Sequence, residues 1–249
     1  MKSARGRLVI LCGPSCVGKT PLVKALGRFY PELHARLGKL VLYNSRRPRP
    51  GEVDGVDYHF RTRERVEALR AEARYAVLEV RSDVQAVDVE ELTAALARGD
   101  VLFEGNPFVG RALDEHPRLA EVEKLSVFVS PLSREEILYL KAEPNVSLQE
   151  MVTDIQRRKL LRRTRRQKQE LGLKDLEEIE VRAASAYGEM KEAWRFQHVI
   201  ANHDGEDSDN WEAFYYLIGD ARKTLEAFAA LLRGETMAGV EKWEEGLVP

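Results

Sequence analysis

The stretch LVILCGPSCVGKT, residues 8–20, constrains the possible folds of this chain more than any other part of the sequence. Its apolar residues lead into a turn that closes on Gly18-Lys19-Thr20, in agreement with the pattern G-x-x-x-x-G-K-[ST]. This pattern joins a buried strand to a helix through a loop whose backbone N–H groups surround phosphate oxygens. Leu22 and Leu26 follow at helical spacing, which favours a phosphate-binding loop over a chance match in a glycine-containing turn.

The chemistry of this loop predicts that the chain binds a nucleoside triphosphate, ATP, together with Mg²⁺. Gly13 and Gly18 allow the backbone to turn its N–H groups inward. Lys19 is expected to reach the β- and γ-phosphates, and the Thr20 hydroxyl is expected to contact the metal ion. The next helix directs the positive end of its dipole at the anion. The expected nucleotide-binding residues of the loop are Gly13, Pro14, Ser15, Cys16, Val17, Gly18, Lys19 and Thr20.

Length and composition narrow the class of protein but not its partners. The 249 residues suit one large α/β domain with insertions, or two small domains. The 39 basic and 41 acidic residues give a formal charge of −2, so the overall charge indicates neither a nucleic acid nor a membrane as partner. The sequence starts without an apolar signal region and contains no long membrane stretch, so we expect a cytoplasmic protein.

A second motif, NSRRPRPGEVDGVDYHF, occupies residues 44–60. Its three closely spaced arginines are interrupted by prolines, which excludes a helix or a central strand. The segment is therefore expected to form a stiff loop that presents guanidinium groups. Their forked donors suit bidentate binding of a phosphate, and a solvated basic loop is the alternative.

Together the two motifs resemble the guanylate kinase family, which pairs a loop of the form GPSGxGKST with a segment of the form STTRxPRxGExxGxDYxF. The resemblance implies a three-layer α/β P-loop fold with a parallel central sheet, of the nucleoside monophosphate kinase type. It also implies that Arg46, Arg49 and Tyr58 bind the phosphate of the acceptor. Glu52 would support the two arginines.

The resemblance implies further site residues beyond the second motif. Glu79, near the end of a predicted strand over residues 75–80, would accept hydrogen bonds from N1–H and the 2-amino group of guanine. An exposed strand-end glutamate is the alternative for this residue. Glu104 would act with Thr20 at the metal ion, and Asn106 would hydrogen-bond the nucleotide.

Two more residues follow from the resemblance in the last third of the chain. Arg182 corresponds to an arginine of the family's lid and is expected to be catalytic, together with Lys19 and Arg46. Asn202, in the segment FQHVIAN, corresponds to an asparagine that lies near the adenine of ATP.

Several positions depart from the family pattern where the acceptor base is expected. Leu42 and Tyr43 replace the usual serines, Asn44-Ser45 replaces the paired threonines, and Gln85-Ala86-Val87 stands where the family has YG[ST]. The expected phosphate contacts are therefore retained, whereas several base contacts are not. This pattern leaves the identity of the acceptor open.

The region between Glu143 and Leu176 carries more cations than a catalytic lid needs, because one well-placed arginine already supplies a large rate effect. The surplus is expected to face solvent, a second copy of the chain in a homodimer, or a polyanion. The basic residues are Arg157, Arg158, Lys159, Arg162, Arg163, Arg165, Arg166 and Lys168.

We expect a single guanylate kinase-like domain. Its core comprises residues 1–39, 99–139 and 183–233, the acceptor-binding region residues 40–98, and the lid residues 140–182. An amphipathic helix is predicted over 211–232, and the tail over 234–249 is expected to be partly mobile. Residues 133–136, SREE, predict a capping box at the start of a helix.

Three functions are compatible with the sequence. The first is transfer of the γ-phosphate of ATP to GMP or dGMP. The second is a related kinase with an altered acceptor, such as a modified purine nucleotide or another phosphate ester. The third is a non-catalytic guanylate kinase-like binding module, which the intact Lys19 and Thr20 disfavour.

The two cysteines, Cys12 and Cys16, both lie in or beside the phosphate loop. A disulfide between them is disfavoured because it would distort a backbone that has to wrap phosphates. A lowered thiol pKa at the helix N-terminus would make Cys16 open to oxidation. A tolerated small residue is the favoured alternative.

Overall fold

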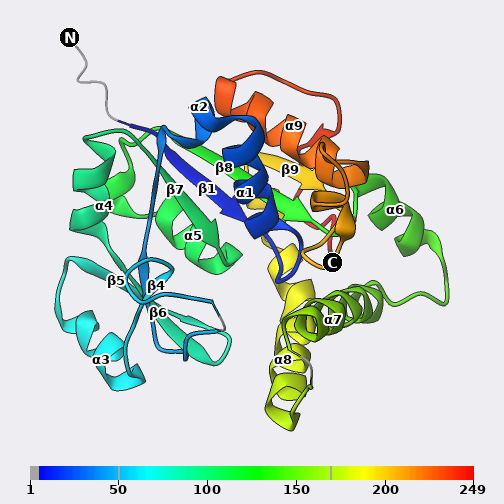
Figure 1. Cartoon of the computed structure of the whole chain (residues 1–249), viewed down its shortest axis with the longest axis horizontal. Helices are drawn as coiled ribbons and strands as arrows, with labels where there is room; N and C mark the ends of the chain where they lie inside the picture. Colours follow the sequence, from blue (N-terminus) through cyan, green and yellow to red (C-terminus); the bar gives the residue numbers. More distant parts are fainter. Residues whose placement is uncertain (1–5, 50, 169) are drawn as a thin grey trace.

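The computed structural model describes residues 6–49, 51–168 and 170–249, which form two sheets surrounded by helices (Figure 1). The strands are β1 (Leu8–Cys12), β2 (Leu37–Lys39), β3 (Leu42–Asn44), β4 (Tyr58–Phe60), β5 (Tyr75–Val80), β6 (Asp83–Asp88), β7 (Asp100–Gly105), β8 (Lys124–Ser130), β9 (His198–Ala201) and β10 (Val240–Glu241). The α-helices are α1 (Lys19–Phe29), α2 (Pro31–His34), α3 (Arg63–Ala68), α4 (Val89–Leu96), α5 (Pro107–Asp114), α6 (Arg134–Ala142), α7 (Leu148–Gln167), α8 (Leu173–Met190) and α9 (Gly219–Arg233).

The larger sheet has the strand order β10-β9-β8-β1-β7-β2. β1 pairs in parallel with β7 and β8, β8 with β9, and β2 with β7, while β10 pairs antiparallel with β9. Every residue of β1 is buried, as expected for a central parallel strand covered on both faces. The predicted α/β fold with a parallel central sheet is therefore confirmed.

The two faces of β1 supply two halves of the core. Val9 and Leu11 pack in a cluster with residues of α1 and α9, including Leu22 and Phe228. The alternate residues of the strand, such as Ile10, pack in a second cluster with residues of α4, α5 and the end of α8. This alternation follows from the period of two in a strand, and it produces three layers.

The smaller sheet has the order β4-β3-β6-β5 and lies beside the larger one. The chain passes from one sheet to the other at residues 40 and 41: β2 ends at Lys39 in the first sheet, and β3 begins at Leu42 in the second. β6 was missed as a strand, because a short mixed run without turn residues around it gives little periodic signal. It forms an antiparallel hairpin with β5.

α7 and α8 pack side by side and project from the core sheet (Figure 1). The small sheet and the α7–α8 pair both extend beyond the same end of the core sheet. The segment between β1 and α1 lies between them. The predicted capping box at the start of α6 is confirmed, since Ser133 and Glu136 exchange both bonds. Among the described residues, no helix is long and apolar enough to cross a membrane.

Two expectations for the C-terminal part are wrong. The helix predicted from Trp211 begins only at Gly219, because Asp204 accepts from the Ala221 backbone N–H at 3.0 Å and so fixes the first turn there. The tail, expected to be partly mobile, is packed: β10 pairs with β9, and Trp243 is only 2% exposed. The Trp243 ring is buried, and its indole N–H donates to Glu241 at 2.6 Å, so the residue anchors the segment by apolar contact and by a hydrogen bond.

Candidate active site

A cavity of about 540 Å³ lies where the phosphate loop, the small sheet and the α7–α8 pair meet. It collects side chains that are far apart in the sequence. The predicted site residues that line it are Gly13, Ser15, Cys16, Lys19, Thr20, Arg46, Arg49, Glu52, Tyr58, Glu104, Asn106 and Arg182.

The backbone of the phosphate loop takes conformations that favour glycine at two positions. Gly13 and Gly18 take φ values of 149° and 102°, and a Cβ on Gly13 would lie 2.3 Å from the Val129 carbonyl oxygen. The Lys19 ammonium bridges the loop by donating to the carbonyls of Gly13 and Pro14, each at 2.8 Å. Burial lowers the pKa of Lys19, which is the behaviour of a cation held out of water.

Thr20 and Glu104 meet at the edge of this loop. The Thr20 hydroxyl donates to Glu104 Oε1 at 2.6 Å, although the residues come from α1 and from the end of β7. Burial raises the pKa of Glu104, and the bond from Thr20 only partly offsets this effect. A hydroxyl and a carboxylate beside a phosphate site form an oxygen donor set that fits Mg²⁺, which binds through one or two carboxylates and phosphate oxygens.

The loop over residues 44–60 presents its arginines to the cavity. Arg46 makes a bidentate pair with Glu52, with Nη1–Oε2 and Nη2–Oε1 distances of 2.6 Å each. Burial opposes the charge on Glu52, but the bonds from Arg46 and the Arg49 backbone outweigh it and lower its pKa. Tyr58 lies beneath Arg46, with 5.0 Å between the guanidinium carbon and the ring centre.

Arg49, from the arginine loop, and Arg182, from α8, complete a cluster of cations in the cavity. Burial first, and then the charges of Arg46 and Arg163, lower the pKa of Arg49. Burial and the neighbouring Arg49, Arg163 and Arg81 lower the pKa of Arg182 well below its ordinary value. Arg182 Nε donates to Ser15 Oγ of the phosphate loop at 3.0 Å. Cations that disfavour one another's charge in this way form a site for an anion.

Two predicted asparagines are engaged by bonds within the protein, and three predicted loop residues do not line the cavity. Asn202 is fully buried, and its amide donates to the Val17 carbonyl at 2.7 Å, so it braces the phosphate loop from behind. Asn106 uses both ends of its amide, one to cap α5 and the other to bind Glu189. Pro14, Val17 and Gly18 are part of the loop but do not line the cavity.

The assignment of Glu79 needs correction. Its side chain is 66% exposed, pairs with Arg63 at 3.3 Å and does not line the cavity. Residues of β5 alternate between the two faces of the small sheet, and Glu79 lies on the face away from the cavity, whereas Val80 lines it. The carboxylate that reaches the cavity from this hairpin is Asp83, on β6.

Asp83 differs from the other acids that line the cavity. Glu52 binds Arg46, Asp57 binds Lys39, Glu104 binds Thr20 and Glu206 binds Arg163. The Asp83 carboxylate makes no hydrogen bond or ion pair within the described ranges 6–49, 51–168 and 170–249. Burial raises its pKa. This carboxylate is therefore free to accept from a ligand.

Sequence reasoning also missed how the lid cations are held. Arg163 pairs with Glu206 at 2.7 Å, and both line the cavity. Most of the other cations pair away from it, Arg157 with Glu180, Arg158 with Asp154, Arg162 with Asp207, Arg166 with Asp209 and Lys168 with Asp175. The pattern of arginines gave no signal for which one turns inward, because the partner acids come from other segments.

The redox hypothesis for Cys16 is wrong. Burial and the charge of Glu206 raise the pKa of its thiol to about 12, so the thiolate that oxidation requires is scarce. Cys16 also takes a φ of 64° at a position where the quoted family pattern has glycine.

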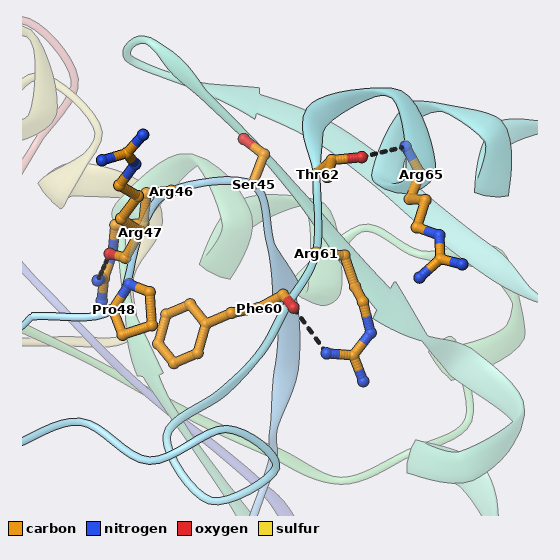
Figure 2. A pocket seen from close by; sticks show the side chains of 8 residues that line it. All are labelled: Ser45, Arg46, Arg47, Pro48, Phe60, Arg61, Thr62 and Arg65. Atoms are coloured by element: carbon orange, nitrogen blue, oxygen red, sulfur yellow. Dashed lines mark hydrogen bonds between the residues drawn. The ribbon is translucent and has the colours of Figure 1, made fainter.

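A second, more open hollow lies on the outer side of the arginine loop (Figure 2). Two of the four arginines that line it are engaged locally. Arg61 donates to the Phe60 carbonyl and pairs with Asp54, and Arg46 belongs to the Glu52 pair. Thr62 caps α3 through the Arg65 backbone N–H.

Comparisons with known proteins agree with this geometry. The guanylate kinase family profile matches residues 5–89. The guanylate kinase of Mycolicibacterium paratuberculosis is 40% identical over 144 residues, covering 54% of this chain and 59% of that protein. The guanylate kinase of Nitratidesulfovibrio vulgaris is 32% identical over 204 residues, covering 81% of each chain. The match thus spans less than two thirds of the first relative and four fifths of the second.

Among solved structures, the crystal structure of guanylate kinase from Anaplasma phagocytophilum matches 94% of this chain and 88% of its own. The TM-score is 0.55 at 19% sequence identity. At this identity the likeness concerns the fold, and it supports the three-layer arrangement described above.

Proposed function

This chain belongs to the guanylate kinase family, and from that premise we propose that it transfers the γ-phosphate of ATP to GMP or dGMP. The observation that carries the proposal is the cation cluster at the phosphate loop. Arg46 and Arg49 come from one side of the cavity and Arg182 from the other. Two phosphate groups that have to approach each other need such charge compensation from both sides.

In the proposed reaction the acceptor phosphate lies on Arg46, Arg49 and Tyr58. One of its oxygens attacks the γ-phosphorus, and the bond to the β–γ bridging oxygen breaks to leave ADP. No general base is needed, since the attacking oxygen is already anionic. Lys19 and Arg182 stabilise the charge that spreads over the transferring group.

Mg²⁺ would be held near Thr20 and Glu104, where it would neutralise phosphate charge when bound. Glu104 is suited to orient the ion through water, because its Oε1 already accepts from Thr20. Across all described residues, no cluster of three or more His, Cys, Asp or Glu side chains could hold a metal alone. This fits an ion whose remaining ligands are phosphate oxygens and water.

We assign the contact with the guanine base to Asp83. Guanine presents N1–H and a 2-amino group side by side, and a carboxylate can accept from both. Asp83 lines the cavity without a partner in the described chain, whereas Glu79 lies outside it. Asp83→Asn should raise the KM for GMP about tenfold, as expected for a lost charged hydrogen bond, and Glu79→Gln should leave it unchanged. A larger effect from Glu79→Gln would overturn this assignment.

The experiment that tests the function is ADP release measured with a panel of nucleoside monophosphates. Turnover should be highest with GMP or dGMP and should be lost in Lys19→Ala, which removes the contact to the β- and γ-phosphates. Turnover with AMP and none with GMP would contradict guanine recognition. Tight ATP binding without turnover on any acceptor would contradict the kinase function itself.

A further inference from the structure

The arginines of α7 find their counter-charge in the same chain. We call residues 204–209, Asp204 to Asp209, the acidic loop; it follows β9 and runs along α7. Three of its acids pair with α7: Asp207 with Arg162 at 3.6 Å, Glu206 with Arg163 at 2.7 Å and Asp209 with Arg166 at 3.0 Å. The acidic loop thus supplies the counter-charge for three of the eight basic residues of this region.

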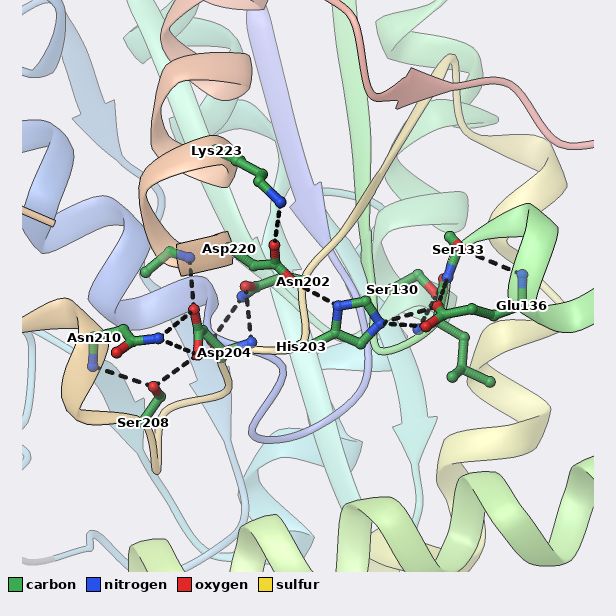
Figure 3. A network of polar contacts seen from close by, with 12 residues as sticks. Ser130, Ser133, Glu136, Asn202, His203, Asp204, Ser208, Asn210, Asp220 and Lys223 are labelled. Carbon is green, nitrogen blue, oxygen red and sulfur yellow. Dashed lines mark hydrogen bonds and ion pairs between the residues drawn. The ribbon is translucent and has the colours of Figure 1, made fainter. Parts of the chain in front are cut away.

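The acidic loop is fixed at its base (Figure 3). Asp204 accepts from the side chains of Ser208 and Asn210 and from the backbone of Ala221, with distances of 2.8 to 3.0 Å. Just before it, the His203 ring lies between Asp220, at 2.5 Å, and Glu136, at 2.8 Å. A loop anchored in this way holds the carboxylate of Glu206 at a defined place.

Glu206 alone among the three paired acids faces the cavity. Its backbone N–H donates to the Cys16 carbonyl at 3.3 Å, which seats it against the phosphate loop. Its side chain is 17% exposed, whereas that of Asp209 is 80% exposed. Burial opposes its charge, but Arg163 and Lys19 outweigh burial and lower the pKa of Glu206.

The Arg163 guanidinium is only partly used by this pair. Nη1 binds Glu206, while the buried Nε has no hydrogen-bond partner in the part of the chain that the structure describes. The side chain is 12% exposed and lines the cavity beside the phosphate loop. A guanidinium has five donors in a fixed plane, so fixing one nitrogen sets the direction of the others.

We propose that Glu206 is a positioning residue, which holds Arg163 so that its remaining donors meet the phosphates of ATP. The inference rests on the proposed function of the cavity and extends it to a pair of residues outside both motifs. Glu52 holds Arg46 in the same manner on the acceptor side. The competing interpretation is that Glu206 occupies the place of a phosphate and hinders binding of ATP.

The test compares Glu206→Gln with the matched control Asp209→Asn. Each substitution removes the charged partner of one α7 arginine, but of the two acids only Glu206 faces the cavity. Glu206→Gln should weaken equilibrium binding of ATP about tenfold and lower kcat, the size expected for a misplaced charged contact. The KM for GMP and the constants of Asp209→Asn should stay within about twofold. Tighter ATP binding by Glu206→Gln would overturn the proposal in favour of hindrance.

A double-mutant cycle decides whether Glu206 acts through Arg163. Arg163→Gln should weaken ATP binding at least as much as Glu206→Gln, and the double variant should be no worse than Arg163→Gln alone. Additive losses would show an independent role for Glu206 and so overturn the proposal. Arg163→Gln and the double variant both lack the guanidinium, so their comparison tests a role of Glu206 through Arg163 even if Glu206→Gln alone does not fold.

Direct ATP binding also separates this proposal from the proposed function. If the wild-type protein binds ATP but phosphorylates no monophosphate, the proposed kinase function is wrong. The ATP dissociation constants of the variants still test the positioning role of Glu206. If turnover is normal and Glu206→Gln binds ATP like wild type, the positioning role fails while the function stands.

Discussion

Two groups of arginines face the cavity from opposite sides. In each group, one arginine forms an ion pair with a glutamate. On the acceptor side, Arg46 and Glu52 are six positions apart in one loop. On the lid side, Arg163 and Glu206 are 43 positions apart, on a helix and on a loop that follows another strand. The ion pair on the acceptor side thus forms within one loop, whereas the ion pair on the lid side joins two segments that are far apart in the sequence. Each side also presents one cation without a carboxylate partner in the described residues, Arg49 and Arg182.

The two cations without a carboxylate partner, Arg49 and Arg182, are expected to have different roles. Arg49 lies with the residues that we propose to bind the acceptor, so its effect should appear in acceptor binding. Arg182 touches the phosphate loop through Ser15, so its effect should appear in the transfer step. The variants below would break this division if their effects fell on the wrong constant.

The largest effect is expected from Arg182→Ala. Loss of a cation beside the transferring group should lower kcat about 10³-fold, as for other arginines that neutralise phosphoryl charge. Both KM values should change much less. Arg182→Lys, which keeps the charge but not the forked donors, should recover part of kcat. A purely structural role would instead lower the melting temperature and leave kcat of the folded fraction intact.

Arg49→Ala should act on the acceptor. The KM for GMP should rise about 100-fold, the equivalent of two to three kcal/mol for a lost charged contact, while the KM for ATP changes less than about threefold. Steady-state kinetics with each substrate varied in turn measures both. Equal effects on the two KM values would remove Arg49 from the acceptor side.

Glu52→Gln should weaken the acceptor side through Arg46 and also change the dependence of stability on pH. The KM for GMP should rise about tenfold as Arg46 loses its bidentate partner. The folded-state pKa of Glu52 lies below its ordinary value, so its contribution is present above the unfolded pKa of about 4.3 and is lost as the pH falls through the folded pKa.

Urea unfolding of wild type and Glu52→Gln at a series of pH values checks this sign. The difference in free energy of unfolding should be constant near neutral pH and should shrink only below about pH 4. A difference that grows as the pH falls would contradict the assigned pair.

The sequence predicted what local pattern dictates. The phosphate loop, the arginine loop, the buried strands and the capping box of α6 each depend on residues within one short segment, and the parallel sheet follows from strands that alternate with helices. Arg46 and Glu52 were therefore both expected. The partners of Arg163 and the packed tail around Trp243 depend on tertiary contacts, which no local pattern contains.

Glu79 illustrates a finer limit. A shift of one position along a strand moves a side chain to the opposite face of the sheet. An alignment error of one position therefore moves a predicted carboxylate from the cavity to solvent. The sequence pattern could place an acid on this hairpin, but the pairing of β5 with β6 was needed to find Asp83 on the side of the cavity. Leu42, which replaces a serine of the family, lines the same cavity.

The smallest effect is expected where α7 faces water. Arg158 pairs with Asp154 at 2.6 Å, but their side chains are 70% and 43% exposed. Solvent screening limits such a pair to about 0.5 kcal/mol, so Arg158→Ala should leave kcat and both KM values unchanged and shift the free energy of unfolding by no more than that. A cycle with Asp154→Asn, read by urea unfolding, measures the coupling. A loss of ATP binding in Arg158→Ala would instead show that the lid arginines act as a collective charge, and that the division between cavity-facing and solvent-facing cations does not hold.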